Sequence, residues 1–214
     1  MDTPVPPPEV GVGAWPGPWP DDPRLDPDLL RDGDRRNVVD GYRYWSVDAI
    51  VADLDTRRHG FHVAIENFGH DFNIGSVVRT ANAFQAAAVH IVGRKRWNRR
   101  GAMVTDRYLH VHHHEDPASL AAWCEQQDLR LVGIDNVPGA TAIETASIPE
   151  RCVMLFGQEG DGLSAEAQHH CREVWSISQF GSTRSINAGA AAAIAMHAWV
   201  RRHVFDQVPD RVIR

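Results

Sequence analysis

Apolar residues follow two alternating patterns from about residue 42 onward. Short, nearly continuous apolar runs are typical of buried strands and lie at 61–65, 89–92, 131–134, 152–156 and 174–177. Other segments have apolar residues at helical spacing, which predicts helices over 42–54, 73–84, 119–127 and 187–204. Strands interleaved with helices predict an α/β fold with a mainly parallel sheet and helices on both faces.

The first 40 residues have a different composition. Nine of the 13 prolines fall within the first 27 residues, and an aspartate-rich stretch follows at 21–34. So little apolar surface cannot offset the entropy lost on ordering, so residues 1–40 are predicted to be an extended, poorly packed arm. A single domain is expected over 41–210.

The bulk composition narrows the class of protein. Hydrophobic residues make up 43% of the 214 residues, enough for a buried core. No apolar run is long enough to span a membrane, and the N-terminus has neither the basic flank nor the apolar core of a secretory signal. The three cysteines are widely spaced and odd in number, which indicates reduced thiols in a cytoplasmic protein.

Charge alone does not indicate nucleic-acid binding, because the formal net charge is -6. Any contact with phosphates must come from a local basic patch, and the segment 94–100 offers one. It holds five cations around Trp97, namely Arg94, Lys95, Arg96, Arg99 and Arg100. A solvated loop and a nucleic-acid contact are both open readings of this segment.

A glycine-rich turn at 157–162 follows the predicted strand 152–156. Open α/β sheets bind ligands at the carboxyl ends of their strands, so the turn occupies a favoured position for a site. Its GxxGxG spacing differs from the dinucleotide-binding pattern GxGxxG, and a tight structural turn is the simpler local explanation. Glu159 stands out, since glutamate is not a preferred turn residue.

Two further blocks carry polar residues beside predicted helices. In FGSTRSIN (180–187), Ser185 and Asn187 precede an alanine-rich helix, where capping is their ordinary role. In FNIGSVVRTANAF (72–84), Asn73 and Arg79 lie within an otherwise apolar helical pattern. Such an arginine either extends to the surface or clamps a phosphate, and local sequence leaves both open.

The three blocks together resemble a family. NIGSVVRTANAF, VMLFGQEGDGLS and SISQFGSTRSINAGAAAA, in this order and spacing, are similar to motifs 1, 2 and 3 of the SpoU (TrmH-like) RNA 2′-O-ribose methyltransferases of the SPOUT superfamily. The resemblance covers roughly residues 60–203. It implies a methyltransferase of class EC 2.1.1 that acts on tRNA or rRNA.

The resemblance also implies a fold, an assembly and a cofactor. Members of the family have a C-terminal deep trefoil knot, which is otherwise nearly absent from proteins, and they work as homodimers. S-adenosyl-L-methionine binds in the knot and leaves as S-adenosylhomocysteine, with no metal required. By motif position, Gly157, Ile177 and Ile186 are expected to line the cofactor pocket.

Catalytic roles follow from the same motif positions. Arg79 resembles the family's catalytic arginine and Asn73 its partner, while Glu159, Ser185 and Asn187 match the remaining catalytic positions. A guanidinium is effectively always protonated, so clamping a phosphate and stabilising oxyanion charge suits Arg79 better than general-base chemistry. Given the family, the five cations of 94–100 are expected to bind RNA.

Some features depart from the family or compete with it. Motif 3 ends Ser185-Ile186-Asn187-Ala188-Gly189 in place of Ser-Leu-Asn-Val-Ser, and the smaller residues are expected to loosen the helix start.

The histidines of 110–114 alternate between the faces of a predicted strand, which argues against a metal site. Alternative functions are a non-catalytic RNA-binding paralogue of the same fold and a nicotinamide-dependent oxidoreductase, the latter disfavoured by the absent GxGxxG.

Overall fold

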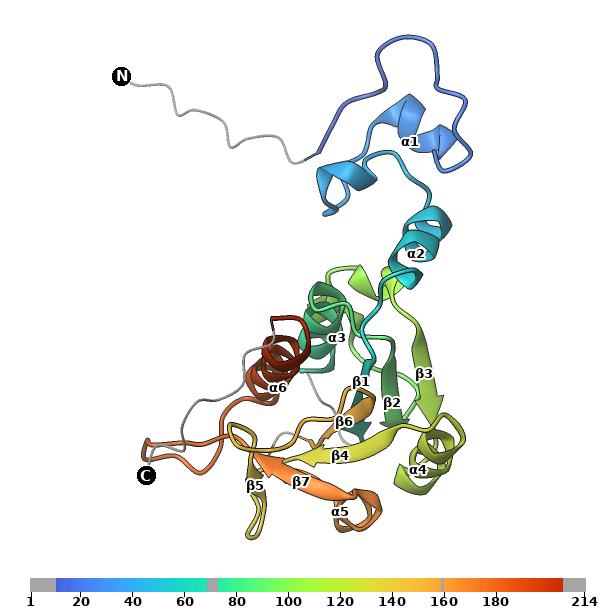
Figure 1. The fold of residues 1–214 in the computed structure, drawn as a ribbon. Helices are drawn as coiled ribbons and strands as arrows, with labels where there is room; N and C mark the ends of the chain where they lie inside the picture. Colours follow the sequence, from blue (N-terminus) through green and yellow to red (C-terminus); the bar gives the residue numbers. More distant parts are fainter. Residues whose placement is uncertain (1–10, 69–72, 159, 206–214) are drawn as a thin grey trace, which may run out of the picture. The chain divides into compact units, whose positions relative to one another are not determined.

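The computed structural model describes residues 11–68, 73–158 and 160–205 (Figure 1). The chain divides into two compact units, Met1–Thr56 and Arg57–Arg214. Composition places the boundary near residue 40, whereas the units separate after Thr56. None of the helices in the described ranges is both long and apolar enough to cross a membrane.

The first unit is organised around a buried carboxylate. It contains α1 (Pro27–Asp32), the short 3-10 helix η1 (Asp40–Tyr42) and α2 (Val47–Asp55). Asp34 is fully buried and accepts hydrogen bonds from the Arg36 guanidinium and from the amide of Tyr44. Burial alone would raise the pKa of Asp34, but these hydrogen bonds lower it to about 2. A buried polar group thus ties residues 34–36 to Tyr44, which apolar composition does not reveal.

One parallel sheet forms the framework of the second unit. Its strands, as far as the chain is described, are β1 (Phe61–Asn67), β2 (Val89–Gly93), β3 (Val111–His114), β4 (Arg130–Ile134), β5 (Thr141–Ala142), β6 (Cys152–Phe156) and β7 (Glu173–Ser176). They lie in the order β3-β2-β1-β6-β4-β7-β5, and every pairing between them is parallel. The predicted α/β class with a mainly parallel sheet is confirmed.

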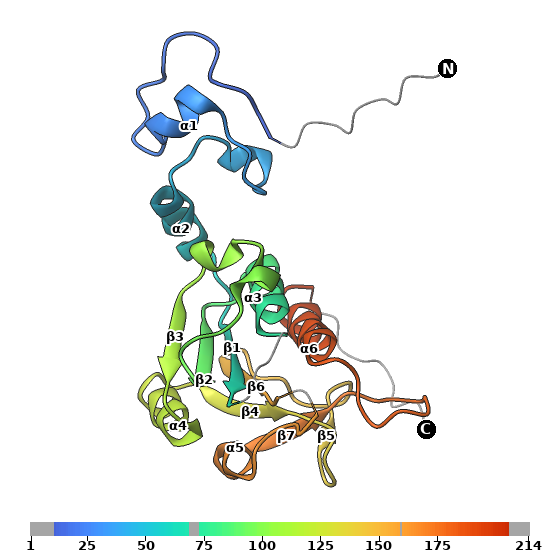
Figure 2. The same ribbon diagram turned by 180° about the vertical axis from the view of Figure 1, so that it is seen from behind.

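Helices cover both faces of the sheet (Figures 1 and 2). On one face lie α3 (Ile74–Ala83) and α6 (Ala188–His203), which share a core with Phe61, Phe156 and Trp175. On the other lie α4 (Pro117–Gln126) and α5 (Ala165–His170), which pack on Leu131 and Leu155. Ala192 and Ala195 of α6 are fully buried, and their small side chains let this helix pack closely on the sheet and on α3.

Periodicity predicts the longer of these elements, but not the short helices α1 and α5 or the connections between elements. The link from β2 to β3 contains two short 3-10 helices, η2 (Arg99–Ala102) and η3 (Thr105–Tyr108). These helices and the two-residue strand β5 are too short to leave a periodic signal. Helix α2 begins at Val47 rather than at residue 42, because Ser46 caps it through a hydrogen bond from the amide of Ala49.

Histidines from three neighbouring strands meet on the sheet face covered by α4. His62 Nδ1 lies 3.0 Å from His90 Nε2, and His90 Nδ1 lies 2.9 Å from His114 Nε2. The ring of His112 stacks on His90, and Trp123 of α4 packs against all four rings. The ring nitrogens form a chain of pairs from His62 through His90 to His114, and they do not converge on one common point. The described residues contain no group of three potential ligands arranged for a metal ion.

These imidazoles are held neutral in the folded chain. Burial, together with His62, His112 and His114, lowers the pKa of His90 to about 2. Burial, with His112 and Arg151, lowers the pKa of His62 to about 4. Burial also lowers the pKa of His112 and of His114, and the carboxylate of Asp116 opposes the shift at His114.

We predict that acidification destabilises the protein between pH 7 and pH 5. An unfolded histidine has a pKa of about 6.5, so His90 binds a proton below this pH in the unfolded chain but stays neutral in the folded chain. Because the unfolded state binds more protons, the free energy of unfolding falls as the pH falls. His90 alone contributes a loss of about 2 kcal/mol over this interval. Urea unfolding at both pH values measures the loss, and His90→Gln, whose amide also offers a donor and an acceptor, should reduce the pH slope. A slope unchanged by this substitution contradicts the assignment.

Candidate active site

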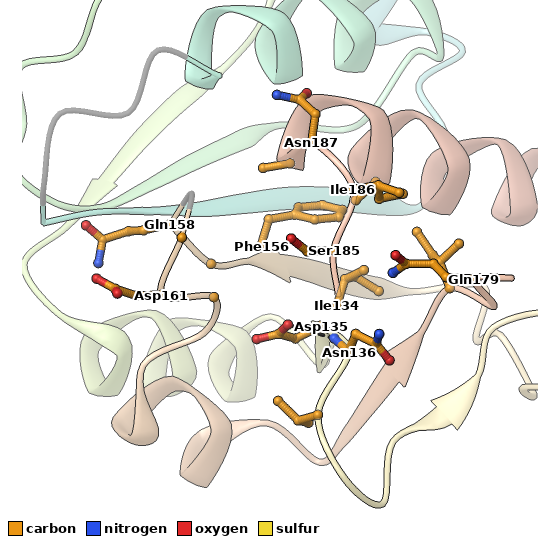
Figure 3. Close-up of a pocket in the computed structure, with 17 residues that line it drawn as sticks. Ile134, Asp135, Asn136, Phe156, Gln158, Asp161, Gln179, Ser185, Ile186 and Asn187 are labelled. Carbon is orange, nitrogen blue, oxygen red and sulfur yellow. Dashed lines mark hydrogen bonds between the residues drawn. The ribbon is translucent and has the colours of Figure 1, made fainter. Parts of the chain in front are cut away.

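A pocket of about 490 Å³ opens at the carboxyl ends of β4, β6 and β7 (Figure 3). Its volume lies within the range of about 300–1,000 Å³ that is usual for small-molecule sites. The lining residues come from the ends of these strands, the glycine-rich turn and the start of α6. They are Ile134, Asp135, Asn136, Val137, Phe156, Gly157, Gln158, Gly160, Asp161, Gly162, Ile177, Gln179, Ser185, Ile186, Asn187, Ala188 and Ala191.

The glycine-rich turn forms one wall of the pocket by folding back on itself. Gln158 and Gly162 exchange two backbone hydrogen bonds of 3.0 Å. A Cβ atom on Gly157 would lie only 2.0 Å from the carbonyl carbon of Gly162, so the two arms of the turn are in direct backbone contact. Gly162 itself has a φ of +70°, which favours glycine. The glycines are therefore required by the turn, and its backbone faces the ligand space.

Polar side chains after β4 connect the turn to the segment that leads into α6. Asp135 Oδ2 accepts a hydrogen bond of 2.8 Å from the amide of Leu163, just after the turn. Asn136 Nδ2 donates one of 3.1 Å to the carbonyl oxygen of Arg184. The connection after β4 thus contacts both other walls of the pocket.

The first and third sequence blocks meet at the beginning of α6. Asn187 Nδ2 donates a hydrogen bond of 2.8 Å to Asn73 Oδ1, which immediately precedes α3. Asn187 Oδ1 meanwhile accepts from the amides of Gly189 and Ala190 and caps α6. Gly189 is buried, and a Cβ atom there would lie 3.3 Å from Ser76 Cβ. Residues far apart in sequence are thereby joined at the pocket edge.

The structure brings together some of the residues expected at the site. Gly157, Ile177 and Ile186, expected to bind the cofactor, all line the pocket, as do Ser185 and Asn187. Asn73 does not line the pocket but contacts Asn187.

The two remaining catalytic candidates differ in position. Arg79 is exposed on α3 and is not among the pocket-lining residues. Glu159 lies outside the described residues.

The five cations of 94–100 are all exposed on the connection after β2. Asn67 Nδ2 supports this connection by donating to the carbonyl oxygens of Arg94 and Arg96. Trp97, the aromatic residue of this segment, is partly buried against the core, and the Arg99 guanidinium lies 5.7 Å from its ring centre. Arg99 also forms a 3.5 Å ion pair with Asp106.

Sequence reasoning missed several pocket residues. Asp135 and Asn136 directly follow the predicted strand 131–134, and the rule that ligands bind beyond the carboxyl ends of strands could have identified them. Gln179 also lines the pocket, from a segment without periodicity. Ile134 and Phe156 were predicted as strand residues, and their side chains in the pocket depend on the twist and order of the sheet.

The fold and the pocket define an α/β protein with a pocket at the carboxyl ends of its parallel strands. The model of the SpoU rRNA Methylase family matches residues 60–197, and the chain belongs to this family. The family resemblance of the three blocks is therefore confirmed.

Curated relatives carry related descriptions. An uncharacterized tRNA/rRNA methyltransferase of Mycobacterium leprae is 28% identical over 165 residues, which cover 74% of this chain and 52% of the relative. One of Mycobacterium ulcerans is 31% identical over 156 residues, covering 70% of this chain and 49% of the relative. The chain therefore spans about half the length of these relatives.

Solved structures share the fold. The TrmH/SpoU tRNA modifying enzyme of A. aeolicus superposes with a TM-score of 0.66 at 16% identity, covering 77% of this chain and 86% of that one. The SpoU methyltransferase AviRb of Streptomyces viridochromogenes, crystallised with the cofactor AdoMet, gives 0.61 at 24% identity, covering 71% and 61%. At these identities the likeness establishes a common fold.

We predict that Gly157→Ala destabilises the turn by about 3 kcal/mol, because its methyl group would overlap backbone atoms that no rotamer change can move. Gly181→Ala is the matched control, since a Cβ at Gly181 has no atom within 4 Å. Chemical unfolding of both variants measures the difference. Equal stability of the two variants would show that the turn can open at little cost.

Proposed function

We propose that this chain transfers a methyl group from S-adenosyl-L-methionine to a ribose 2′-hydroxyl of tRNA or rRNA. Membership of the SpoU family supports an RNA methylase. The observation that carries the proposal is the hydrogen bond between Asn187 and Asn73, which joins motif 3 to motif 1 at the edge of a pocket lined by motif 2. Residues suited to cofactor and to substrate thus adjoin one another.

The pocket suits the proposed cofactor. Ile134, Phe156, Ile177 and Ile186 offer apolar surface for a planar base, while Asp135 offers a carboxylate for a hydroxyl or amino group. When bound, the sulfonium of S-adenosyl-L-methionine supplies a methyl group that is already electrophilic. The protein's task is then to orient the ribose hydroxyl and to assist the loss of its proton.

Arg79 and the two asparagines provide the means of orienting the substrate. Arg79 is exposed on α3, the helix that Asn73 immediately precedes, so its guanidinium is accessible to RNA. It clamps a phosphate next to the target ribose and stabilises developing negative charge, as a permanently protonated group can. Asn73 and Asn187 hold α3 and α6 in register beside the pocket, and Glu159 and Ser185 complete the proposed catalytic set.

We predict that Arg79→Ala lowers methyl transfer at least about 100-fold while leaving cofactor affinity unchanged, because Arg79 does not line the pocket. Transfer of labelled methyl from S-adenosyl-L-methionine to total RNA of a strain lacking the gene measures turnover, and calorimetry measures binding. Arg172→Ala, which removes an exposed arginine that does not line the pocket, is the control. Near-normal turnover of Arg79→Ala would exclude Arg79 from catalysis.

The distribution of charge supports RNA as the substrate. Residues 1–56 contain 12 acidic and 5 basic residues, a net charge of -7, whereas residues 57–214 contain 16 acidic and 17 basic residues, a net charge of +1. The overall charge of -6 therefore comes from the first unit. Arg94, Lys95, Arg96, Arg99 and Arg100 give the methylase part a concentrated basic segment for phosphates.

We predict that Lys95→Ala/Arg96→Ala weakens RNA binding and lowers the salt dependence by about one unit of slope for each phosphate that is no longer neutralised. Both side chains are exposed, so the fold should be unaffected. Filter binding of total tRNA at several salt concentrations measures the slope. Arg201→Ala/Arg202→Ala at the end of α6 is the matched control, and an equal effect there would indicate only a general influence of charge.

The trefoil knot and the homodimer belong to the same proposal. The segment before α6 contacts the connection after β4 through the carbonyl group of Arg184 and lines the pocket with Ser185, and we propose that this segment belongs to the knot. Ile194 on α6 and Phe180 before it are exposed apolar residues suited to a subunit contact. Sedimentation equilibrium tests the dimer, and a monomer at micromolar concentration would contradict it.

Mass spectrometry of nucleosides tests the site of methylation. RNA from strains with and without the gene is digested, and loss of one 2′-O-methyl nucleoside is the expected result. Loss of a base-methylated nucleoside instead would overturn ribose specificity. Unchanged RNA and no cofactor binding would favour the non-catalytic RNA-binding paralogue.

A further inference from the structure

Glu66 is a buried carboxylate that the proposed chemistry does not use. It is the next-to-last residue of β1, and its side chain is fully buried. Its Oε2 accepts a hydrogen bond of 2.8 Å from the amide of Ser164, and its Oε1 accepts one of 2.6 Å from Ser164 Oγ. Two charge-assisted hydrogen bonds thus hold one residue by both its backbone and its side chain.

The surroundings of Glu66 do not favour its charge. The charged groups that act on it in the described part of the chain are Glu166 of α5 and Asp135 after β4, both acidic. Glu66 in turn adds to the rise in the pKa of the Cys171 thiol, whose main cause is burial. Burial, opposed by the hydrogen bonds from Ser164, raises the pKa of the Glu66 carboxyl. A buried carboxylate among acids is unfavourable, so global stability is a poor explanation for it.

Ser164 is the residue at which the glycine-rich turn joins α5. The preceding residue, Leu163, is held by Asp135 through its own amide. Since β1 and β4 flank β6 in the sheet, one carboxylate from each neighbouring strand end holds the chain where it returns from the turn. Any shift of residues 163–164 would move Gly162, whose carbonyl group already contacts Gly157. The pocket wall therefore depends on this anchor.

Capping of α5 does not explain the arrangement. Ser164 Oγ caps this helix by accepting from the amide of Ala167, which requires no carboxylate. Glu66 accepts hydrogen bonds from the Ser164 hydroxyl and from its amide in addition, and both bonds join the end of β1 to the residue that precedes α5.

We propose that Glu66 is a positioning residue for the cofactor pocket, acting through Ser164 to hold the glycine-rich turn in its ligand-binding conformation. This inference rests on the proposed function, because it takes S-adenosyl-L-methionine as the ligand. Ionised Glu66 accepts both hydrogen bonds, whereas a protonated carboxyl retains only one unambiguous acceptor. The affinity of the pocket is therefore coupled to the charge of a group that does not line it.

Calorimetric titration with S-adenosyl-L-methionine tests the proposal in the full chain. Glu66→Gln keeps the shape but replaces one acceptor by a donor, and we expect its Kd to rise about tenfold at about pH 8. Wild-type affinity should fall as the pH is lowered toward the raised pKa of the Glu66 carboxyl, while the variant stays flat, so that the two profiles converge at acid pH. A residue that only supports folding would not produce this difference in pH profile.

Two further variants separate the possible explanations. Glu166→Gln removes an exposed neighbouring acid that influences Glu66 but makes no described contact with the turn, and should bind as wild type at about pH 8. Ser164→Ala removes only the hydroxyl group, and it should weaken cofactor binding. Because Ser164 and Glu66 act through the same contact, the effects of Ser164→Ala and Glu66→Gln should not add. If Glu66→Gln does not fold, Ser164→Ala alone tests the proposal.

The outcomes are distinguishable. If folded wild-type protein does not bind S-adenosyl-L-methionine, the proposed function fails. If wild type binds, but Glu66→Gln and Ser164→Ala bind equally well with the same pH profile, the positioning role is overturned and the function stands.

Discussion

The hydrogen bond from Asn187 to Asn73 links the two segments on which the pocket depends. The same Asn187 side chain caps α6, so one amide both begins the helix and attaches it to the residue that precedes α3. Because the helix start is held there, Ser185 and Ile186 lie on the pocket instead of extending into solvent as an unattached loop. The Ala-rich face of α6 then packs on α3 and on the sheet, in the core that also contains Phe61, Phe156 and Trp175.

Around this anchor the site combines rigid backbone with few charged groups. The turn at 157–162 is constrained by contact between its own arms. The carboxylates of Asp135 and Glu66 accept hydrogen bonds from the two residues that follow it, Leu163 and Ser164. Backbone groups so fixed can bind a ligand with little further loss of entropy. The basic side chains instead lie on the exposed connection after β2, where the β1 residue Asn67 supports the main chain and leaves the cations accessible. A rigid pocket and an exposed basic connection suit the proposed small cofactor and the proposed polyanionic substrate.

Much of the fold could be predicted from the sequence, because long elements impose their period on the apolar residues. The strands at 61–65 and 152–156 and the helices at 73–84 and 187–204 correspond to β1, β6, α3 and α6. The polar contacts could not be predicted in this way. Glu66 and Ser164 are 98 residues apart, and Asn73 and Asn187 are 114 apart. No local pattern reports such pairs, and motif similarity identified the asparagines without indicating that they touch.

The departure in motif 3 illustrates how packing changes a local expectation. Small residues at 188 and 189 are expected to loosen the start of α6, since glycine lowers helix propensity. In the structure Gly189 is buried between the helix start and α3, and a Cβ there would lie 3.1 Å from Asn187 Oδ1 and 3.3 Å from Ser76 Cβ. A larger side chain would push α6 away from α3 and strain the Asn187–Asn73 hydrogen bond. The glycine therefore permits the close approach of α6 to α3 in this chain, where the contact with Ser76 offsets the low helix propensity of glycine.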